Sequence, residues 1–490
     1  DCLALADFCL EMTGHGNRGV SESALDFWDE LQCLEMDKRH ESLRAPVYAR
    51  LVEVLVGCAR YPAHVVDCEE DEEDLDDFNL YRRRVEEGLL NCACSLKGHS
   101  LTLLCGLLAK HAGDWHHTEA VLFSMHCVAG EILTLPAVSE RNLILSNVTT
   151  LFTSYVFPGA LPAHELVHRG SLRVVEAYCK CVQQNLSLVE PGLGYILPKL
   201  SEGKLSQHAA KAFAGVCTKG HECLRKEGMM GTVIDAVTSR YGAIGREPME
   251  TSVQALGRVL SSFDPPAMMS ELERLTAPFV ERLRAAADGA RTSFVSAAVL
   301  SEVAFLVTLL GSAIRFVEPR DVPAGQHHPV AVAVGNAWPV LEAVCGKFGG
   351  DPSITDAMQG LIVKAIRQAK ADASPLLLNM MQATTSSFRT TRAASCLEAV
   401  GVAVEVFGQA QGGASTFGGI FGDVSGAAFE AIQSSGVDAH PEVITAYFDM
   451  SYRYLLFCTD GILPHPSFPA ALDLSLACLP LKEKDPLRAV

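Results

Sequence analysis

The pentapeptide His164–His168, with the sequence HELVH, comes nearest to a catalytic centre in this sequence. On a helix, its two histidines would lie on one face and could bind zinc, with the glutamate as general base. The extended zinc motif also needs a glycine and a third histidine, but Ser171 and Val174 occupy those positions. Pro162 before the pentapeptide and Gly170 after it indicate a junction between two helices. A zinc hydrolase is therefore the weakest of three functional hypotheses.

No other pattern in the sequence predicts enzyme chemistry. The glycine-rich stretch 411–426 has no Lys-Ser/Thr pair after a glycine, so it is not a phosphate-binding loop. His116, His117 and His126 are spread around one predicted helix, and no carboxylate or thiol clearly completes a metal site with them. We expect a protein that is not an enzyme and has no catalytic residue, metal or cofactor.

The residues between Asp67 and Asp77, DCEEDEEDLDD, predict an interaction site. They carry nine carboxylates, which equal half of the formal net charge of -18. Repulsion between them predicts an open, solvated loop between helices, which could bind a basic partner, fold back over the protein, or have no partner. The three arginines that follow could dock this loop or contact acidic cargo. The candidate partner-binding residues here are Glu69, Glu70, Asp71, Glu72, Glu73, Asp74, Asp76, Asp77, Arg82, Arg83 and Arg84.

These candidate residues lie among a long series of predicted helices. Apolar residues at a spacing of three or four, such as Leu272, Leu275, Phe279 and Leu283, indicate amphipathic helices, and the alternation typical of strands is absent. The fold class is therefore all-α. The predicted helices include 46–60, 77–96, 118–135, 172–184, 205–224, 249–262, 268–287, 292–314, 330–348, 354–371 and 392–409.

The repetition of these helices predicts a HEAT or armadillo-like solenoid. Helix pairs that recur about every 40–47 residues are typical of such arrays, and 490 residues hold roughly ten to twelve pairs. We expect residues 1–490 to form one solenoid with a concave partner-binding surface, interrupted by the acidic loop at 67–77 and a glycine-rich loop at 411–426. The apolar stretch 292–314 is long enough to span a membrane, but Glu302 near its middle favours a buried helix.

Composition narrows the function further. The acidic net charge argues against direct nucleic-acid binding, which needs a basic face, and the 49% of apolar residues exclude a wholly disordered chain. The 17 cysteines are scattered and odd in number, as expected for reduced thiols in the cytosol or nucleus. Because the sequence does not begin with Met, we expect it to be a piece of a longer protein.

A series of motifs in a fixed order resembles one branch of the importin-β superfamily, the branch that contains transportin-SR and importin thirteen. The sequences FWDEL at 27–31 and DDFNLYRRRV at 76–85 are similar to two helices that flank an acidic linker in that branch. The resemblance extends over about 27–446. Further matching motifs are Trp115–Phe123, Pro191–Tyr195, Ala209–Ala212, His328–Pro329, Ala337–Leu341 and His440–Glu442.

This resemblance implies a nuclear transport receptor, or karyopherin, that shuttles between nucleus and cytoplasm. Its implied partners are protein cargo, the Ran GTPase and FG nucleoporins, with cargo released by Ran-GTP and import as the direction; neither nucleic acid nor membrane is implied. The N-terminal repeats that clasp Ran-GTP in the family are expected to be absent from this chain. A HEAT-repeat scaffold without Ran dependence is the alternative.

One part of the resemblance concerns cargo. Transportin-SR holds phosphorylated Arg-Ser segments with an arginine-rich helix, and the matching helix here keeps Lys364 and Arg367 as basic residues. Ala357, Gly360 and Val363 stand where earlier arginines would be expected. Lys364 and Arg367 are therefore candidate partner-binding residues, whereas the cargo, basic or Arg-Ser-rich, stays open.

Overall fold

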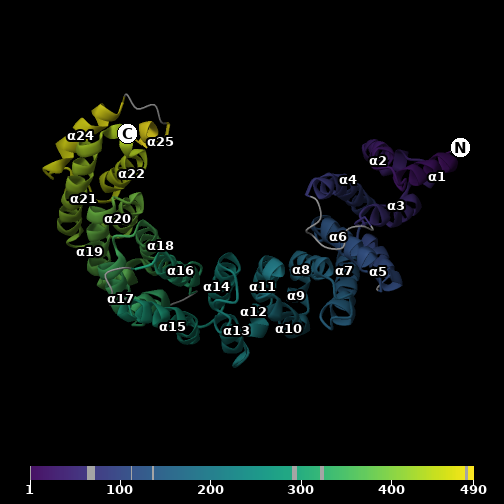
Figure 1. Cartoon of the computed structure of the whole chain (residues 1–490), viewed down its shortest axis with the longest axis horizontal. Coiled ribbons are helices and arrows are strands. Elements are labelled where there is room, and N and C mark those ends of the chain that lie inside the picture. The colour runs from purple at the N-terminus through teal and green to yellow at the C-terminus, as the bar shows by residue number, and fades with distance from the viewer. Residues whose placement is uncertain are drawn as a thin grey trace. The chain divides into compact units, whose positions relative to one another are not determined.

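The chain folds almost entirely into helices (Figure 1). The computed structural model describes residues 2–62, 72–111, 113–134, 137–289, 295–319, 325–479 and 484–489. Across these residues there is no strand, and one isolated bridge joins Tyr241 and Ile244. The predicted all-α fold class is confirmed.

Contacts divide the chain into two compact units, which we describe separately. Unit 1 comprises residues 1–224 and 240–249, and unit 2 comprises residues 225–239 and 250–490. Within each unit, consecutive helices pack as pairs, and each pair stacks on the next to give two layers. The single solenoid over residues 1–490 stays a prediction.

In unit 1, the first helix of each pair lies in one layer and the second helix in the other. The first layer contains α1 (Cys2–Thr13), α3 (Ala45–Cys58), α5 (His99–His111), α7 (Val138–Leu151) and α10 (Val189–Lys199). The second contains α2 (Arg18–Gln32), α4 (Glu72–Leu96), α6 (Trp115–Ile132), α8 (Glu165–Ala177) and α11 (Ser206–Lys219). The short helices α9 (Cys179–Gln184) and α12 (His221–Leu224) lie between and after these pairs.

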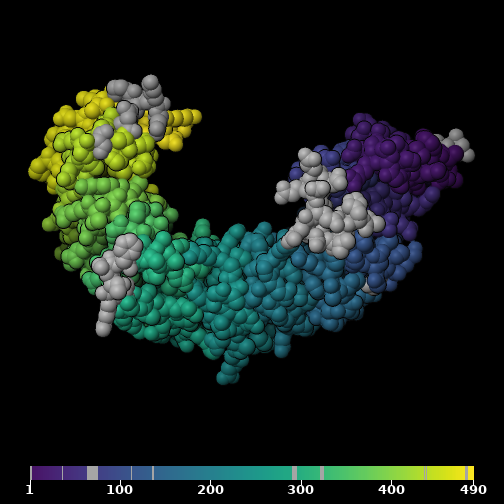
Figure 2. Space-filling model, viewed as in Figure 1, coloured from purple at the N-terminus to yellow at the C-terminus, as the bar shows by residue number. Residues whose placement is uncertain are grey.

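Unit 2 repeats this arrangement, and the space-filling view shows that side chains close the gaps between neighbouring ribbons (Figure 2). Its first layer contains α13 (Met229–Thr238), α15 (Pro265–Gly289), α17 (Pro329–Phe348), α19 (Ser374–Thr391), α21 (Gly413–Ser435) and α24 (Ser467–Cys478). Its second layer contains α16 (Ala297–Ile314), α18 (Pro352–Ala369), α20 (Ala394–Phe407) and α22 (Pro441–Phe457). Helix α14 (Arg246–Leu260) begins in unit 1 and continues into unit 2 at Glu250. The short helices α23 (Thr459–Ile462) and α25 (Lys484–Ala489) pack on α22.

Tight turns complete the described chain. The 3-10 turns are Met36–Lys38, Glu41–Leu43, Leu186–Leu188, Gly203–Leu205, Lys370–Ala373 and Val437–Ala439, and Phe152–Val156 forms a π-turn that extends α7.

The core is a series of apolar stripes, one for each helix. In α15, Leu272, Leu275, Phe279 and Leu283 are fully buried, as their spacing predicted. Burying one such side chain contributes about 1.5–3 kcal/mol. The helices are therefore stabilised mainly by the burial of their apolar stripes, and less by intrinsic helix propensity.

The predicted helix 172–184 is wrong as a single element, because α8 ends at Ala177 and α9 begins at Cys179. Between them, Tyr178 adopts φ -96° and ψ 14° and leaves the helical conformation. Its buried hydroxyl donates a hydrogen bond of 2.9 Å to the carbonyl oxygen of Met125 in α6. This bond satisfies a polar group that would otherwise be buried without a partner, and it stabilises the break.

The predicted glycine-rich loop at 411–426 is also wrong, because α21 covers Gly413–Ser435. The helix starts after Gly412, whose φ of 81° suits glycine. Phe417, Phe421 and Val424, at a spacing of three or four, are buried in the unit 2 core. Their burial outweighs the low helix propensity of the glycines, and Gly422 lets the helix approach His465, whose ring would lie 2.7 Å from an added Cβ.

Two helices, α16 and α17, are long and apolar enough to cross a membrane by length and composition. Half of the apolar window of α16 and 44% of that of α17 are buried within the protein. In α16, Val303, Leu306 and Leu310 are buried, and the helix packs against α15 and α18. A core helix of a helical array can be as long and as apolar as a membrane-spanning helix. The packing of α16 against α15 and α18 is that of a core helix.

Candidate partner-binding site

The HELVH sequence caps a helix in this structure. His164 has extended backbone angles at the N-terminus of α8, and its Nδ1 accepts a hydrogen bond of 3.2 Å from the Leu166 amide. Its ring stacks on Trp115 with 3.8 Å between centroids, whereas His168 lies within the helix. The two imidazoles therefore lack the shared helical register that the zinc motif requires. No group of three or more His, Cys, Asp or Glu among the described residues is placed to hold a metal ion.

The predicted acidic loop lies only partly in the described chain. Glu69, Glu70 and Asp71 fall outside the described residues. The loop prediction is wrong from Glu72 onward, because α4 begins there and contains the rest of the run. The side chains of Glu72, Glu73 and Asp74 are not described, whereas those of Asp76 and Asp77 are exposed. Carboxylates in the first turns of a helix interact favourably with its dipole, which explains why the run can continue into α4.

Arg82, a candidate partner-binding residue from the sequence, is buried. Its side chain is 7% exposed and pairs with Glu119 of α6 at 2.7 Å. The guanidinium also lies over the rings of Phe123, Tyr61 and Phe78, at 4.0, 4.6 and 5.5 Å from their centroids. A buried carboxylate and three aromatic faces thus hold Arg82 in the core, where a partner cannot reach it.

The two neighbouring arginines differ from Arg82 and from each other. Arg83 is exposed on α4. Arg84 is half-buried and pairs with Asp26 at 2.8 Å and Asp29 at 3.0 Å, both on α2. Arg84 therefore joins α2 to α4, and Arg83 is the member of the triplet that a partner can reach.

The two basic residues of α18 lie at different depths. Lys364 is half-buried, and an added Cβ at Gly311 of α16 would lie 3.2 Å from its Nζ. Burial lowers the pKa of Lys364, while the nearby Glu250 opposes this shift. Arg367 is exposed. Gly311 thus provides space for Lys364 between helices, and partner binding by these two residues remains a proposal.

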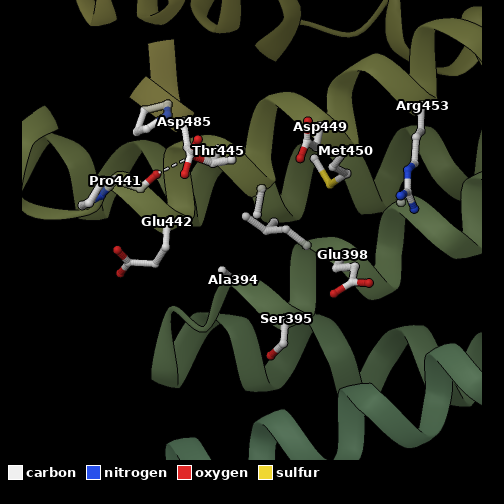
Figure 3. Close-up of a pocket in the computed structure, with 14 residues that line it drawn as sticks. Ala394, Ser395, Glu398, Pro441, Glu442, Thr445, Asp449, Met450, Arg453 and Asp485 are labelled. Atoms are coloured by element: carbon white, nitrogen blue, oxygen red, sulfur yellow. Dashed lines mark hydrogen bonds between the residues drawn. The ribbon is translucent and has the colours of Figure 1, made fainter. Parts of the chain in front are cut away.

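A groove between α20 and α22 in unit 2 is suited to a ligand (Figure 3). Its volume is about 700 Å³, which is in the range of ligand-binding clefts. Helix α25 closes one side of it through Asp485 and Pro486. Its lining comprises Ala394, Ser395, Leu397, Glu398, Gly401, Pro441, Glu442, Thr445, Ala446, Asp449, Met450, Arg453, Asp485 and Pro486.

The groove is acidic. Glu398 from α20, Glu442 and Asp449 from α22, and Asp485 from α25 are all exposed carboxylates in its lining. Arg453 is the cation of the lining, and its Nη1 lies 3.7 Å from Glu405 outside the groove. No cation of the described residues forms an ion pair with these four carboxylates, so they favour a positively charged ligand.

The arrangement of the groove does not resemble a catalytic site. Ser395 donates a hydrogen bond of 2.6 Å to Asp356, and the lining contains no histidine that could act as its base. Thr445 donates to the carbonyl oxygen of Pro441 within α22 at 2.9 Å. What these groups can do is bind cations and hydrogen-bond donors.

This groove was not predicted from the sequence. The charged residues of α20 and α22 are separated by a helix, and neither helix contains an acidic run. The groove could have been predicted from acidic residues that recur at exposed positions of two consecutive second-layer helices. That recurrence becomes visible only once the layers are assigned.

The tryptophans that support the family resemblance pack helices together. Trp28 is fully buried and donates from Nε1 to Thr13 at 2.8 Å. Trp115 stacks on His164, which links α6 to the start of α8. Trp338 is 4% exposed in α17. These three tryptophans therefore have a packing role in the fold.

Comparison with known proteins supports the same family. A family model of the transportin-3/importin-13 fourth TPR domain matches residues 328–432, from the start of α17 into α21. Importin-13 of Homo sapiens is 20% identical over 483 residues, which cover 90% of this chain and 47% of that protein. Importin-13 of Gallus gallus is 20% identical, with 90% of this chain and 48% of that protein covered. The chain thus spans about half the length of the curated relatives it matches.

Solved structures show the same fold. A structure of importin-13 in its cytosolic state matches with a TM-score of 0.79 and 16% identity, covering 99% of this chain and 56% of that chain. A crystal structure of importin-β matches with a TM-score of 0.56 and 12% identity, covering 96% of this chain and 60% of that chain.

The stacked helix pairs and these matches define a HEAT-type helical-repeat protein, as predicted. The chain is similar to importin-13 along 90% of its length, and residues 328–432 match the transportin-3/importin-13 family model.

Proposed function

We propose that this chain is part of a karyopherin that imports protein cargo into the nucleus and releases it when Ran-GTP binds. The observation that carries this proposal is the similarity to importin-13, which extends along 90% of the chain. Such a receptor shuttles between cytoplasm and nucleus, passes the pore by contacts with FG nucleoporins, and binds neither membrane nor nucleic acid directly.

Two structures of another protein with this fold support Ran and nucleoporins as partners. Kap95p matches with a TM-score of 0.57 in a structure that describes its binding to RanGDP, and with a TM-score of 0.50 in a complex with Nup1. We infer that the corresponding partners of this chain are the Ran GTPase and FG nucleoporins.

The groove between α20 and α22 supplies a place where cargo can bind. Its exposed carboxylates suit a lysine- or arginine-rich segment that lies between the two helices. Exposed ion pairs contribute about 0–1 kcal/mol each, so several must act together to bind such a segment. The groove therefore selects basic cargo more by charge than by any single contact, and high salt weakens the complex.

A pull-down separates this proposal from a scaffold without Ran dependence. The immobilised full-length gene product is incubated with Ran loaded with a non-hydrolysable GTP analogue or with GDP, and bound Ran is measured. We expect retention of the GTP form and its competition with bound cargo. Equal retention of both forms, or none, would refute a Ran-regulated receptor and favour the scaffold.

A further inference from the structure

Two exposed arginines of unit 2 lie over one aromatic ring. The guanidinium group of Arg258, in the last turn of α14, lies 4.2 Å from the centroid of the Phe316 ring. That of Arg315, which directly follows α16, lies 5.1 Å from the same centroid. We define the arginine cluster as these two arginines, Phe316 and Lys364 of α18. Because both guanidinium groups contact the same ring, they lie close together on the surface of unit 2.

Glycines in α14 and α16 bring the cluster together. A Cβ added at Gly257, the residue before Arg258, would clash with the carbonyl oxygen of Ala313, so only glycine lets α14 approach α16 this closely. A Cβ added at Gly311 of α16 would lie 3.2 Å from the Nζ of Lys364, so a larger side chain there would displace the ammonium group. The packing of the helices therefore sets where the three cations lie.

Hydrogen bonds fix the backbone around the cluster. The Ser261 hydroxyl, just beyond α14, donates to the carbonyl oxygen of Phe316 and accepts a hydrogen bond of 3.1 Å from the Glu318 amide. From α18, the side-chain amide of Gln368 donates to the carbonyl oxygen of Arg315 at 2.6 Å. These bonds connect the C-terminal ends of α14 and α16 to each other and to α18. Binding to a surface that is ordered in advance costs less conformational entropy.

Neither arginine of the cluster is neutralised by a carboxylate of the described residues. No ion pair or hydrogen bond joins the guanidinium group of Arg258 or Arg315 to an acidic side chain in that part of the chain. Glu318 is exposed and close in sequence, and it pairs with neither arginine. Glu250 of α14 is engaged by Ser312 of α16, from which it accepts a hydrogen bond of 2.9 Å. The two guanidinium groups can therefore bind an anion from outside the chain.

Lys364 extends the positive charge of the cluster onto α18. Its side chain is half-buried, and no ion pair neutralises it among the residues that the structure describes. Burial lowers its pKa, Glu250 opposes this shift, and Arg315 adds to it, as expected for a lysine close to that arginine. A ligand with more than one anionic group can therefore contact α14, α16 and α18 together.

We propose that the arginine cluster binds a carboxylate-rich segment of a protein partner. A guanidinium group that lies over an aromatic ring keeps its N–H groups available at its edges, and arginine donates paired hydrogen bonds to a carboxylate. Two closely spaced Glu or Asp residues can therefore bind Arg258 and Arg315 together. The cluster is separate from the arginine-rich helix of the family resemblance, because its arginines belong to α14 and to the end of α16. Binding of this kind does not depend on the proposed transport function.

A short acidic segment fits the cluster better than a nucleic acid does. Nucleic-acid binding relies on an extended basic face that neutralises many phosphates, whereas the cluster consists of two arginines and one lysine around a single ring. The chain has a net charge of -18, so it repels a long polyanion beyond the cluster. A few carboxylates within one segment match the charge of the cluster without extending past it.

Fluorescence anisotropy of the full chain at low salt tests this proposal. The probe is a labelled twelve-residue peptide of alternating Glu and Gly, compared with the same peptide carrying Gln and with a labelled oligothymidylate of equal length. The test variant is Arg258→Gln/Arg315→Gln. The matched control is Arg225→Gln/Lys226→Gln, which removes two exposed cations elsewhere in unit 2 and changes the net charge equally.

The Glu peptide is expected to bind more tightly than the Gln peptide. The test variant should bind the Glu peptide roughly threefold to tenfold more weakly, because it loses two exposed charge pairs, and the control should change little. Circular dichroism and thermal melting check that the variants fold. If the double variant does not fold, the single variant Arg258→Gln decides the test and should weaken binding about twofold to threefold.

Three results would overturn the proposal. Equal weakening in the test variant and the control would show a general charge effect. Absence of Glu-peptide binding, or equal binding of the Glu and Gln peptides, would show that the cluster does not select carboxylates. Tighter, cluster-dependent binding of the oligothymidylate would assign the cluster to nucleic acid instead.

Discussion

The buried pair between Arg82 and Glu119 offers a direct test of the energetics of unit 1. The change is Glu119→Gln, which keeps the size of the side chain and removes its charge. Both side chains are nearly buried, at 7% and 6% exposure, so the substitution leaves the Arg82 cation in the core without a counterion. Removing one partner of a buried ion pair costs about 3–5 kcal/mol.

The aromatic rings around Arg82 reduce this loss. The guanidinium remains 4.0 Å from the Phe123 centroid and 4.6 Å from that of Tyr61, and such contacts contribute about 0.5–2 kcal/mol. We therefore expect a loss near the lower limit, about 3 kcal/mol. At an m-value of about 3 kcal/mol/M, the urea midpoint of unit 1 falls by about 1 M.

Tryptophan fluorescence can follow unit 1 alone. The chain has three tryptophans, of which Trp28 and Trp115 lie in unit 1 and Trp338 in unit 2. In a Trp338→Phe background, urea unfolding therefore reports on unit 1.

The matched control is Glu53→Gln, which breaks an exposed pair with Lys110 of 3.5 Å in the same unit and should cost less than about 1 kcal/mol. The double variant Arg82→Leu/Glu119→Leu should recover much of the loss, since it leaves no unpaired charge. If Glu119→Gln costs no more than Glu53→Gln, the pair does not act as a buried ion pair and our reasoning is refuted.

Two further predictions concern the helix contacts of α21 and the acidic groove. Gly422→Ala should destabilise unit 2 in thermal melts, because the new Cβ would lie 2.7 Å from the His465 ring. The control Gly419→Ala, in the same helix, meets no atom within 4 Å and should stabilise unit 2 by up to about 1 kcal/mol. If both variants stabilise unit 2, or both destabilise it, the packing of α21 is contradicted. The double variant Glu398→Gln/Glu442→Gln should weaken binding of a labelled Lys-Arg peptide by roughly threefold to tenfold and make the affinity less dependent on salt. An unchanged affinity at low salt would exclude the groove as the binding site of the peptide.

The repeated helices could be predicted from the sequence because each apolar stripe is a local pattern. Leu272, Leu275 and Phe279 are buried as their spacing indicates. The helix α21 was missed because glycine content was given more weight than the spacing of Phe417 and Phe421, which tertiary packing rewards. Intrinsic propensity is a weak guide where burial is extensive.

The candidate sites were harder to predict because they depend on contacts between helices. Arg82 lies in a row of three arginines, and nothing local distinguishes it from Arg83; its burial requires Glu119 and Phe123 from the next pair. The acidic groove likewise combines residues from α20, α22 and α25. Sequence patterns report the side of a helix that is buried, but they do not report which neighbour will lie there.

The hydrogen bonds that secure the core have a consequence for how the chain folds during synthesis. Among the described residues, buried side-chain bonds between helices join groups that are close in sequence, such as Thr384 and Gln359 at 25 residues, Tyr178 and Met125 at 53, and Ser21 and Tyr81 at 60. Short separations reduce the entropy lost in loop closure and favour rapid folding. Each helix pair can therefore complete its polar core soon after the next pair leaves the ribosome, so the array can grow in order from its N-terminal end.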